Sequence, residues 1–262
     1  MGRRWNRALV TGASTGIGAA CCRALAAEGT DLVVVARDAG RLRALADELE
    51  PAVTVEVLPA DLAEADQLAG VEARLRAEGD AIDLLVNNAG FGKSGDFVEL
   101  DIDIETNVIA VNVVAVQRLA HAAGGRMAAA GSGTILNVSS VAAYLPGPGS
   151  ATYAASKSFV TSFSIGLGEE LGPRGVTVTT LAPGFTRTEF QERAGMDPGQ
   201  VPAVVWQSAE HVARAGLDGA AAGRVVVIPG VHNKLAAGAG RLMPGWLLQK
   251  VTGVGRKATS GR

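Results

Sequence analysis

A glycine-rich turn between an apolar strand and an Ala-rich helix constrains this chain more than any other feature of its sequence. Arg7 to Val10 (RALV) has the composition of a short buried strand, and Thr11 to Gly18 (TGASTGIG) follows at once. Ala19 to Glu28 then continues as a helical stretch. Strand, glycine turn and helix in this order are the start of a nucleotide-binding α/β fold.

Each glycine of the turn has a separate use. Gly12 permits the tight turn, Gly16 lets the backbone approach a pyrophosphate, and Gly18 allows close packing of the helix. The N-terminus of the helix offers unpaired N–H groups and a positive dipole end to the phosphates. The alternative is a flexible turn without a ligand, and the flanking strand and helix favour the phosphate site.

A second motif indicates proton transfer. Tyr153 and Lys157 lie four residues apart in Ala151 to Lys157 (ATYAASK), which places phenol and ammonium on one face of a helix. A fixed cation lowers the pKa of a phenol from its usual value of about 10, and each unit corresponds to ~1.4 kcal/mol. A drop of about two to three units, from the ammonium and a bound oxidised nicotinamide, predicts proton exchange by Tyr153 near neutral pH. Chance spacing on a helix is the alternative.

Five motifs follow one another along the chain: TGASTGIG at Thr11 to Gly18, NNAG at Asn87 to Gly90, Asn112, Ser140, and Tyr153 with Lys157. In this order and spacing they resemble the short-chain dehydrogenase/reductase family, in its ordinary single-domain branch. The resemblance runs from about Arg7 to about Pro229. It implies an oxidoreductase with a Rossmann-type fold.

The resemblance also implies catalytic roles. Ser140 is expected to hydrogen-bond the substrate oxygen, and Tyr153 to transfer the proton. Lys157 is expected to lower the pKa of Tyr153 and to hold the nicotinamide ribose, and Asn112 to position a water in the proton relay. Ser139 competes for the serine role, and the interval of thirteen residues to Tyr153 favours Ser140.

The implied cofactor site draws on the turns and loops that follow successive strands. Its residues are Gly12, Ser14, Thr15, Gly16, Ile17, Gly18, Arg37, Asp61, Leu62, Asn88, Ala89, Gly90, Tyr153, Lys157, Pro183, Gly184, Thr186 and Thr188. Among them, Asp61 resembles the family's contact to the adenine ring, and Thr188 resembles the contact to the nicotinamide carboxamide.

The end of the second strand favours NADP(H) over NAD(H). Ala36 stands where NAD-selective relatives carry Asp, so no carboxylate repels a 2′-phosphate, and Arg37 offers a planar fork suited to bidentate contact. Thr15 stands where many NADP-using relatives carry a second basic residue, and Asp38 weakens the preference. A solvated loop arginine is the alternative reading of Arg37.

The alternation of strands and helices predicts one α/β domain, a doubly wound parallel sheet of about seven strands over residues 1–262. The strands are expected at 7–11, 32–36, 53–58, 83–86, 134–138, 176–181 and 225–228, and the helices at 16–28, 40–49, 64–78, 103–129, 152–171 and 208–218. The core is expected over about 7–229, followed by a basic and apolar tail over about 230–262. With 48% hydrophobic and 19% charged residues, the chain can form a large core.

Cysteine and histidine usage places further limits. Cys21 and Cys22 are adjacent and cannot join distant segments, so we expect buried thiols, a reducing compartment and a cytoplasmic protein. His121, His211 and His232 are isolated, so no metal site is predicted. No nucleic-acid partner is expected. The chain is expected to form a homodimer or a homotetramer.

The tail departs from the neutral charge balance. From Arg224 onward it carries seven Lys or Arg and no Asp or Glu, interleaved with apolar residues such as Leu242 and Trp246. Such a segment could contact a membrane surface, and packing between subunits is the favoured alternative.

The sequence therefore predicts an NADP(H)-dependent oxidoreductase that transfers a hydride between the nicotinamide and a carbonyl or secondary alcohol. A catalytically silent dinucleotide-binding regulatory protein is the alternative. Aromatic residues border the expected substrate cleft and favour an apolar substrate: Phe91, Tyr144, Phe185 and Phe190. They could equally be core or dimer contacts.

Overall fold

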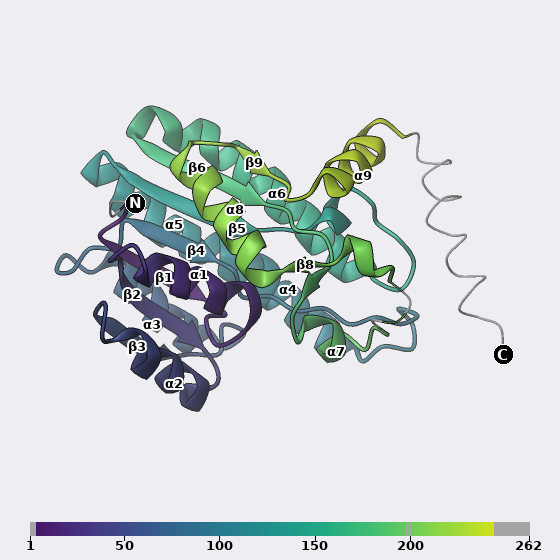
Figure 1. Cartoon of the computed structure of the whole chain (residues 1–262), viewed down its shortest axis with the longest axis horizontal. Helices are drawn as coiled ribbons and strands as arrows, with labels where there is room; N and C mark the ends of the chain where they lie inside the picture. The colour runs from purple at the N-terminus through teal and green to yellow at the C-terminus, as the bar shows by residue number, and fades with distance from the viewer. Residues whose placement is uncertain (1–3, 198, 200, 244–262) are drawn as a thin grey trace.

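The structure is a computed structural model that describes residues 4–197, 199 and 201–243. Seven parallel strands form its main sheet, in the order β3-β2-β1-β4-β5-β6-β9 (Figure 1). They are β1 (Arg7–Thr11), β2 (Asp31–Ala36), β3 (Val55–Pro59), β4 (Leu84–Asn87), β5 (Gly133–Val138), β6 (Val176–Leu181) and β9 (Val226–Val227). The doubly wound parallel sheet of seven strands is confirmed, with ends shifted by one or two residues.

Helices cover both faces of the sheet. The larger ones are α1 (Gly16–Ala26), α2 (Ala39–Leu49), α3 (Ala65–Arg76), α4 (Ile102–Ile109), α5 (Val116–Ala130), α6 (Ala151–Leu171), α8 (Ala209–Ala221) and α9 (Val231–Leu242). Figure 1 shows α1 and α8 on the near side of the sheet. Both faces are therefore shielded from water, as a parallel sheet requires.

The core consists of two apolar clusters, one on each face of the sheet. Along β1 and β2 successive residues alternate between them: Ala8 and Val34 belong to the cluster under α1, α2 and α8, whereas Leu9 and Val33 belong to the cluster under α3, α5 and α6. This follows from the two-residue period of a strand, and it explains why these strands are apolar at almost every position.

The strand order reverses at β1, which pairs with β2 on one side and with β4 on the other. The crossovers diverge there, so the turns after β1 and β4 leave a crevice at the carboxyl edge of the sheet. In open α/β sheets ligands bind in that crevice.

The long helix expected at 103–129 is interrupted. A π-helical turn over Ala110–Ala115 separates α4 from α5. The stretch Ile102–Ala130 is long and apolar enough to cross a membrane by length and composition alone, but half of its most apolar window is buried inside the protein. Contacts of α5 with α3 and β5 show that it packs within the fold.

Several short elements were not predicted. They are the 3-10 turns Val141–Ala143, Gly172–Arg174 and Ala203–Val205, helix α7 (Phe190–Arg193), and the two-stranded sheet of β7 (Thr186–Arg187) and β8 (Gln207–Ser208). The expected core boundary at about 229 is wrong, because α9 follows directly and its Ala237 is buried against Tyr144 and Ala182. The remainder of the proposed tail, including Trp246, lies outside the described residues.

Two glycines test how this backbone is built. Gly175 adopts a φ of +78°, and a Cβ there would lie 2.0 Å from the carbonyl oxygen of Gly131. Gly166 lies within α6 with open space around it. We expect Gly175→Ala to lower the free energy of unfolding by at least about 1 kcal/mol. Gly166→Ala should raise it by up to about 1 kcal/mol, because alanine is the better helix former.

Urea unfolding of both variants beside the unmutated protein measures the two changes. A neutral Gly175→Ala would show that the loop between α6 and β6 relaxes freely.

Candidate active site

A cleft of about 1650 Å³ opens at the carboxyl edge of the sheet, where the strand order reverses. Its walls are the glycine turn after β1, the ends of β2 and β3, the turn after β4, the N-terminal part of α6 and the loop after β6. Helix α9 closes one end, with Asn233 and Ala236 among the lining residues.

The turns after β1 and β4 are joined by a compact set of hydrogen bonds. The hydroxyl of Thr11 accepts from the backbone N–H groups of Asn88 and Ala89, each at 3.0 Å. The Asn88 amide donates in return to the carbonyl oxygens of Thr11, at 2.9 Å, and Gly12, at 3.2 Å. Here Asn88 fixes the position of the glycine turn relative to the centre of the sheet.

Gly18 sits directly behind this turn. A Cβ at Gly18 would lie 2.2 Å from the carbonyl oxygen of Gly12, so no larger residue fits without displacing the turn. The helix N-terminus can therefore approach a phosphate group in the cleft closely.

Nearly all of the expected cofactor residues line the cleft: Gly12, Ser14, Thr15, Gly16, Ile17, Arg37, Asp61, Leu62, Asn88, Ala89, Gly90, Tyr153, Lys157, Pro183, Gly184, Thr186 and Thr188. Gly18 is the exception, because it is buried behind the turn. At the far end Arg37 is exposed, with its guanidinium 3.7 Å from the Asp61 carboxylate.

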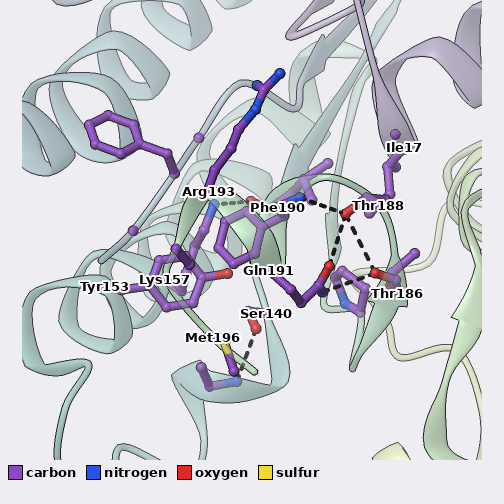
Figure 2. Close-up of a pocket in the computed structure, with 18 of the residues that line it drawn as sticks. Ile17, Ser140, Tyr153, Lys157, Thr186, Thr188, Phe190, Gln191, Arg193 and Met196 are labelled. Atoms are coloured by element: carbon purple, nitrogen blue, oxygen red, sulfur yellow. Dashed lines mark hydrogen bonds between the residues drawn. The ribbon is translucent and has the colours of Figure 1, made fainter. Parts of the chain in front are cut away.

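Ser140, Tyr153 and Lys157 come together in the middle of the cleft (Figure 2). Ser140 follows β5 and accepts a hydrogen bond from the backbone N–H of Ala142 at 3.1 Å, so it caps a short 3-10 turn. Lys157 is buried, and its ammonium donates to the carbonyl oxygen of Val138 at 2.9 Å. The side chains of Tyr153 and Lys157 both reach the cleft from one helix.

The two adjacent serines have different surroundings. Ser139 is buried, and its hydroxyl is bonded to the carbonyl oxygen of Lys157 at 2.8 Å and to the hydroxyl of Thr161 at 2.7 Å. Ser140 instead forms a side-chain hydrogen bond with Tyr153. Geometry therefore gives Ser139 a structural role and leaves Ser140 beside the phenol.

Burial shifts the two titratable groups in opposite directions. It raises the pKa of Tyr153 to about 12, and the hydrogen bond with Ser140 lowers it only in part. It lowers the pKa of Lys157 to about 8. Desolvation disfavours the charged form in both cases. The expected lowering of the Tyr153 pKa by Lys157 is thus not produced by the protein's own groups, and at neutral pH Tyr153 is a neutral hydroxyl donor.

Asn112 lies in the π-helical turn, behind the cleft wall. Its amide donates to the carbonyl oxygen of Phe91, at 2.9 Å, and to the hydroxyl of Ser156, at 3.0 Å, and its oxygen accepts from the N–H of Phe91 at 3.1 Å. Asn112 is fully buried and does not line the cleft. It holds the loop segment that follows Gly90 against α6.

Three of the four expected substrate residues line the cleft: Phe91, Phe185 and Phe190. The Phe190 ring packs on the Tyr153 ring, with centroids 5.4 Å apart (Figure 2). The placement of Tyr144 was wrong. Its ring is buried under α9, where the Arg241 guanidinium lies 4.9 Å from its centroid. Since α9 was not foreseen, nothing in the sequence signalled this cover.

Other cleft residues were missed altogether. Gln191 is buried and donates to the carbonyl oxygen of Thr186 at 2.9 Å. Asn233 donates to Gln207 at 3.1 Å and to the carbonyl of Pro229 at 2.8 Å, which fastens α9 to the loop after β6. Arg41 lines the cleft four residues after Arg37. Arg37 precedes α2, which begins at Ala39, so helical spacing could not have paired these two arginines.

The family model of the short chain dehydrogenases matches residues 6–198. The chain belongs to the short-chain dehydrogenase/reductase family. The match includes the glycine turn, Ser140, Tyr153 and Lys157, so the members of the site fall within the family's own region.

Individual relatives of this short-chain dehydrogenase/reductase match the chain over most of its length. A short-chain dehydrogenase from Sphingobium yanoikuyae, solved in complex with NADPH, is 41% identical, covers 87% of this chain and 88% of its own, and has a TM-score of 0.83. A bulky-bulky ketone specific alcohol dehydrogenase from Comamonas testosteroni is 36% identical, with coverages of 92% and 95% and a TM-score of 0.78. A 3-oxoacyl-[acyl-carrier-protein] reductase of Synechocystis sp. is 38% identical over 73% of this chain and 78% of that protein.

The buried ammonium of Lys157 makes stability depend on pH. Its pKa is about 8 in the folded protein, below the ordinary value of 10.5. Between these values the unfolded chain binds the proton that the folded chain has released, so this group's contribution to stability rises with pH. Below about pH 8 the charged group costs about 3 kcal/mol, which Lys157→Met removes.

We therefore expect Lys157→Met to stabilise the fold most at pH 7, with an advantage that shrinks towards pH 10. Urea unfolding of both proteins from pH 7 to 10 measures the difference, in which the contributions of Cys21 and Cys22 cancel. Lys234→Met, at an exposed position of α9, is the control. An advantage independent of pH would contradict the buried charge.

Proposed function

We propose that this protein is an NADP(H)-dependent oxidoreductase that interconverts a carbonyl compound and a secondary alcohol. The observation that carries the proposal is the convergence of Ser140, Tyr153 and Lys157 inside a cleft built for a dinucleotide. Membership of an oxidoreductase family supports it. One relative solved with NADPH supports the cofactor, and two others, named as a ketone specific alcohol dehydrogenase and a 3-oxoacyl-[acyl-carrier-protein] reductase, support the chemistry between carbonyl and alcohol.

The residues of the cleft fit the cofactor. Gly12 and Gly16 leave backbone exposed beside the N-terminus of α1, where a pyrophosphate is stabilised. The end of β2 carries Ala36 and Arg37, which suit a 2′-phosphate. Thr186 and Thr188 line the cleft on the side of the glycine turn, with Thr188 against Gly16. When bound, NADPH supplies the hydride.

The chain's own residues then handle the oxygen and the proton. The hydroxyls of Ser140 and Tyr153 donate hydrogen bonds to the carbonyl oxygen of the substrate, which polarises the C=O bond. As hydride adds to carbon, Tyr153 gives its proton to the developing alkoxide. A Tyr153 pKa of about 12 keeps this proton in place until then. The Lys157 ammonium lies close to the phenolate that remains, 5.8 Å from the Tyr153 ring centroid, and stabilises it.

An apolar substrate fits the cleft best. Apolar side chains line the cleft together with Ser140: Phe91, Leu145, Phe185, Phe190, Met196 and Val205. Burying them against a hydrocarbon group is favourable, whereas a strongly hydrated substrate would lose its water without compensation. NADPH oxidation with a panel of bulky ketones, aldehydes and 3-oxoacyl thioesters tests both the activity and the preference.

Cellular setting and assembly complete the proposal. Cys21 and Cys22 are buried free thiols, which supports a reducing cytoplasm. Ile102 and Ile109 of α4 are exposed apolar side chains, which supports packing between subunits in a homo-oligomer.

The two tyrosines of the chain form a matched pair for testing the proton donor. Tyr153→Phe should lower kcat by a factor of about 100 or more, because loss of a general acid has that scale, and should leave NADPH binding nearly intact. Tyr144→Phe should retain the activity, because the Tyr144 hydroxyl has no hydrogen-bond partner among the described residues and lies outside the cleft. Steady-state kinetics with any accepted ketone measures both, and normal turnover by Tyr153→Phe would exclude Tyr153 as the acid.

Cofactor preference is predicted from the end of β2. The unmutated protein should bind NADPH more tightly than NADH, because Arg37 is placed for the 2′-phosphate and Ala36 carries no opposing charge. Arg37→Ala should reduce the difference. Titration followed by nicotinamide fluorescence gives both dissociation constants, and equal affinities in the unmutated protein would refute the preference.

A further inference from the structure

An exposed ion pair at the rim of the cleft joins the start of α2 to the loop after β6. The guanidinium Nη1 of Arg41, at the start of α2, lies 2.9 Å from both carboxylate oxygens of Glu189, which is 148 positions away in the sequence. Glu189 also accepts from Arg193 of α7 at 2.5 Å. Among the described residues, this is the ion pair that links the adenosine end of the cleft to the loop after β6.

Arg41 lies near the ribose 2′-group, which is the position at which NADPH and NADH differ. It lines the cleft with Ala36 and Arg37, at the end of β2, where the ribose 2′-group of a dinucleotide lies. Asp38 holds the start of α2 by accepting from the Arg41 N–H at 3.0 Å, and its carboxylate lies 3.5 Å from the Arg41 Nε. Arg41 therefore lies near the position of the 2′-phosphate, and its guanidinium is already paired with the carboxylate of Glu189.

In the loop after β6, the exposed Glu189 lies between two residues that line the cleft, Thr188 and Phe190. The preceding Thr188 closes over Gly16, where an added Cβ would come within 2.9 Å of its methyl group. The following Phe190 packs on the Tyr153 ring (Figure 2). The position of Glu189 is thus tied to the cover over both the phosphate turn and the phenol.

A carboxylate and a phosphate cannot both be served fully by one guanidinium. Arginine binds phosphate in bidentate geometry, and the phosphate carries the larger charge. NADH has no 2′-phosphate and leaves the pair of Arg41 and Glu189 undisturbed.

We propose that Glu189 determines cofactor specificity by competing with the 2′-phosphate of NADPH for Arg41. This rests on the proposed use of NADPH. Binding of the 2′-phosphate transfers Arg41 from Glu189 to the phosphate, so part of the gain from the phosphate contact is offset by loss of the ion pair. When Arg41 leaves Glu189, the segment of Thr188 to Arg193 loses its ion pair to the start of α2. Recognition of the 2′-phosphate is thereby linked to the position of Phe190 over Tyr153.

The test uses Glu189→Gln, which keeps the size of the side chain and removes its charge. Binding is titrated with adenosine 2′,5′-bisphosphate and with adenosine 5′-monophosphate, which differ in the 2′-phosphate and lack the nicotinamide. Glu189→Gln should bind the bisphosphate about 1.5- to 5-fold more tightly, the scale of an exposed ion pair, and the monophosphate unchanged. The gain should shrink as salt is added.

Two further variants separate competition from a general effect of charge. Glu192→Gln removes a carboxylate from the same helix α7, without a hydrogen bond or ion pair to Arg41, and should leave both affinities unchanged. In an Arg41→Ala background Glu189→Gln should lose its effect, because the competitor then has nothing to compete for.

Hydrogen exchange of residues 188–193 gives a readout that is independent of affinity. The bisphosphate should raise exchange there relative to the monophosphate, and Glu189→Gln should raise it without ligand. Equal affinity of the unmutated protein for the two nucleotides would overturn both the proposed NADPH preference and the proposed competition for Arg41. A clear preference for the bisphosphate that does not respond to Glu189→Gln, or that responds equally in the Arg41→Ala background, would overturn only the proposed competition for Arg41.

Discussion

The hydroxyl of Thr11 holds together the two turns on which the whole cleft depends. It accepts hydrogen bonds from the N–H groups of Asn88 and Ala89, and the Asn88 amide bonds back to the carbonyls of Thr11 and Gly12. These groups lie at the point where the crossovers of the sheet diverge, so they would otherwise be unpaired polar groups at the edge of a buried strand. By satisfying one another they fix the distance between the phosphate turn and the loop after β4, whose Phe91 is bonded to Asn112, and thereby the width of the site.

The site uses one physical effect, removal from water, to set two charges. Burial keeps Tyr153 protonated and brings the pKa of Lys157 down to about 8, close to neutral. Both groups carry their protons below about pH 8, so the neutral phenol and the ammonium coexist at neutral pH. A more open cleft would return both pKa values towards their ordinary values, so the phenol would lose its proton at a lower pH and the ammonium would keep its proton to a higher pH. Enclosure by Phe190 and α9 therefore favours the neutral phenol and weakens the hold of Lys157 on its proton.

Features set by local sequence were predictable, and those set by contact between distant segments were not. The glycine turn, the strands and the pair of Tyr153 and Lys157 depend on neighbours within a few residues, and they were placed correctly. Tyr144 was misplaced because its surroundings are decided by α9, almost 90 positions later. The raised pKa of Tyr153 in the protein alone was not foreseen, because spacing reveals a nearby cation but not the degree of burial. Arg41 and Glu189 showed no joint signal, since nothing short of the fold brings them together.

The π-helical turn at Ala110–Ala115 rotates the faces of α4 and α5 relative to each other. Each extra residue in a turn advances the helix by about 100°, so α4 and α5 are out of phase with each other. The face that α5 presents to β5 and the face that α4 presents to α6 are therefore not one continuous stripe. Substitutions that reshape the outer surface of α4 need not propagate into the packing of α5. The wide turn that brings Asn112 to Phe91 thus also acts as a joint between two separately adaptable surfaces, one internal and one external.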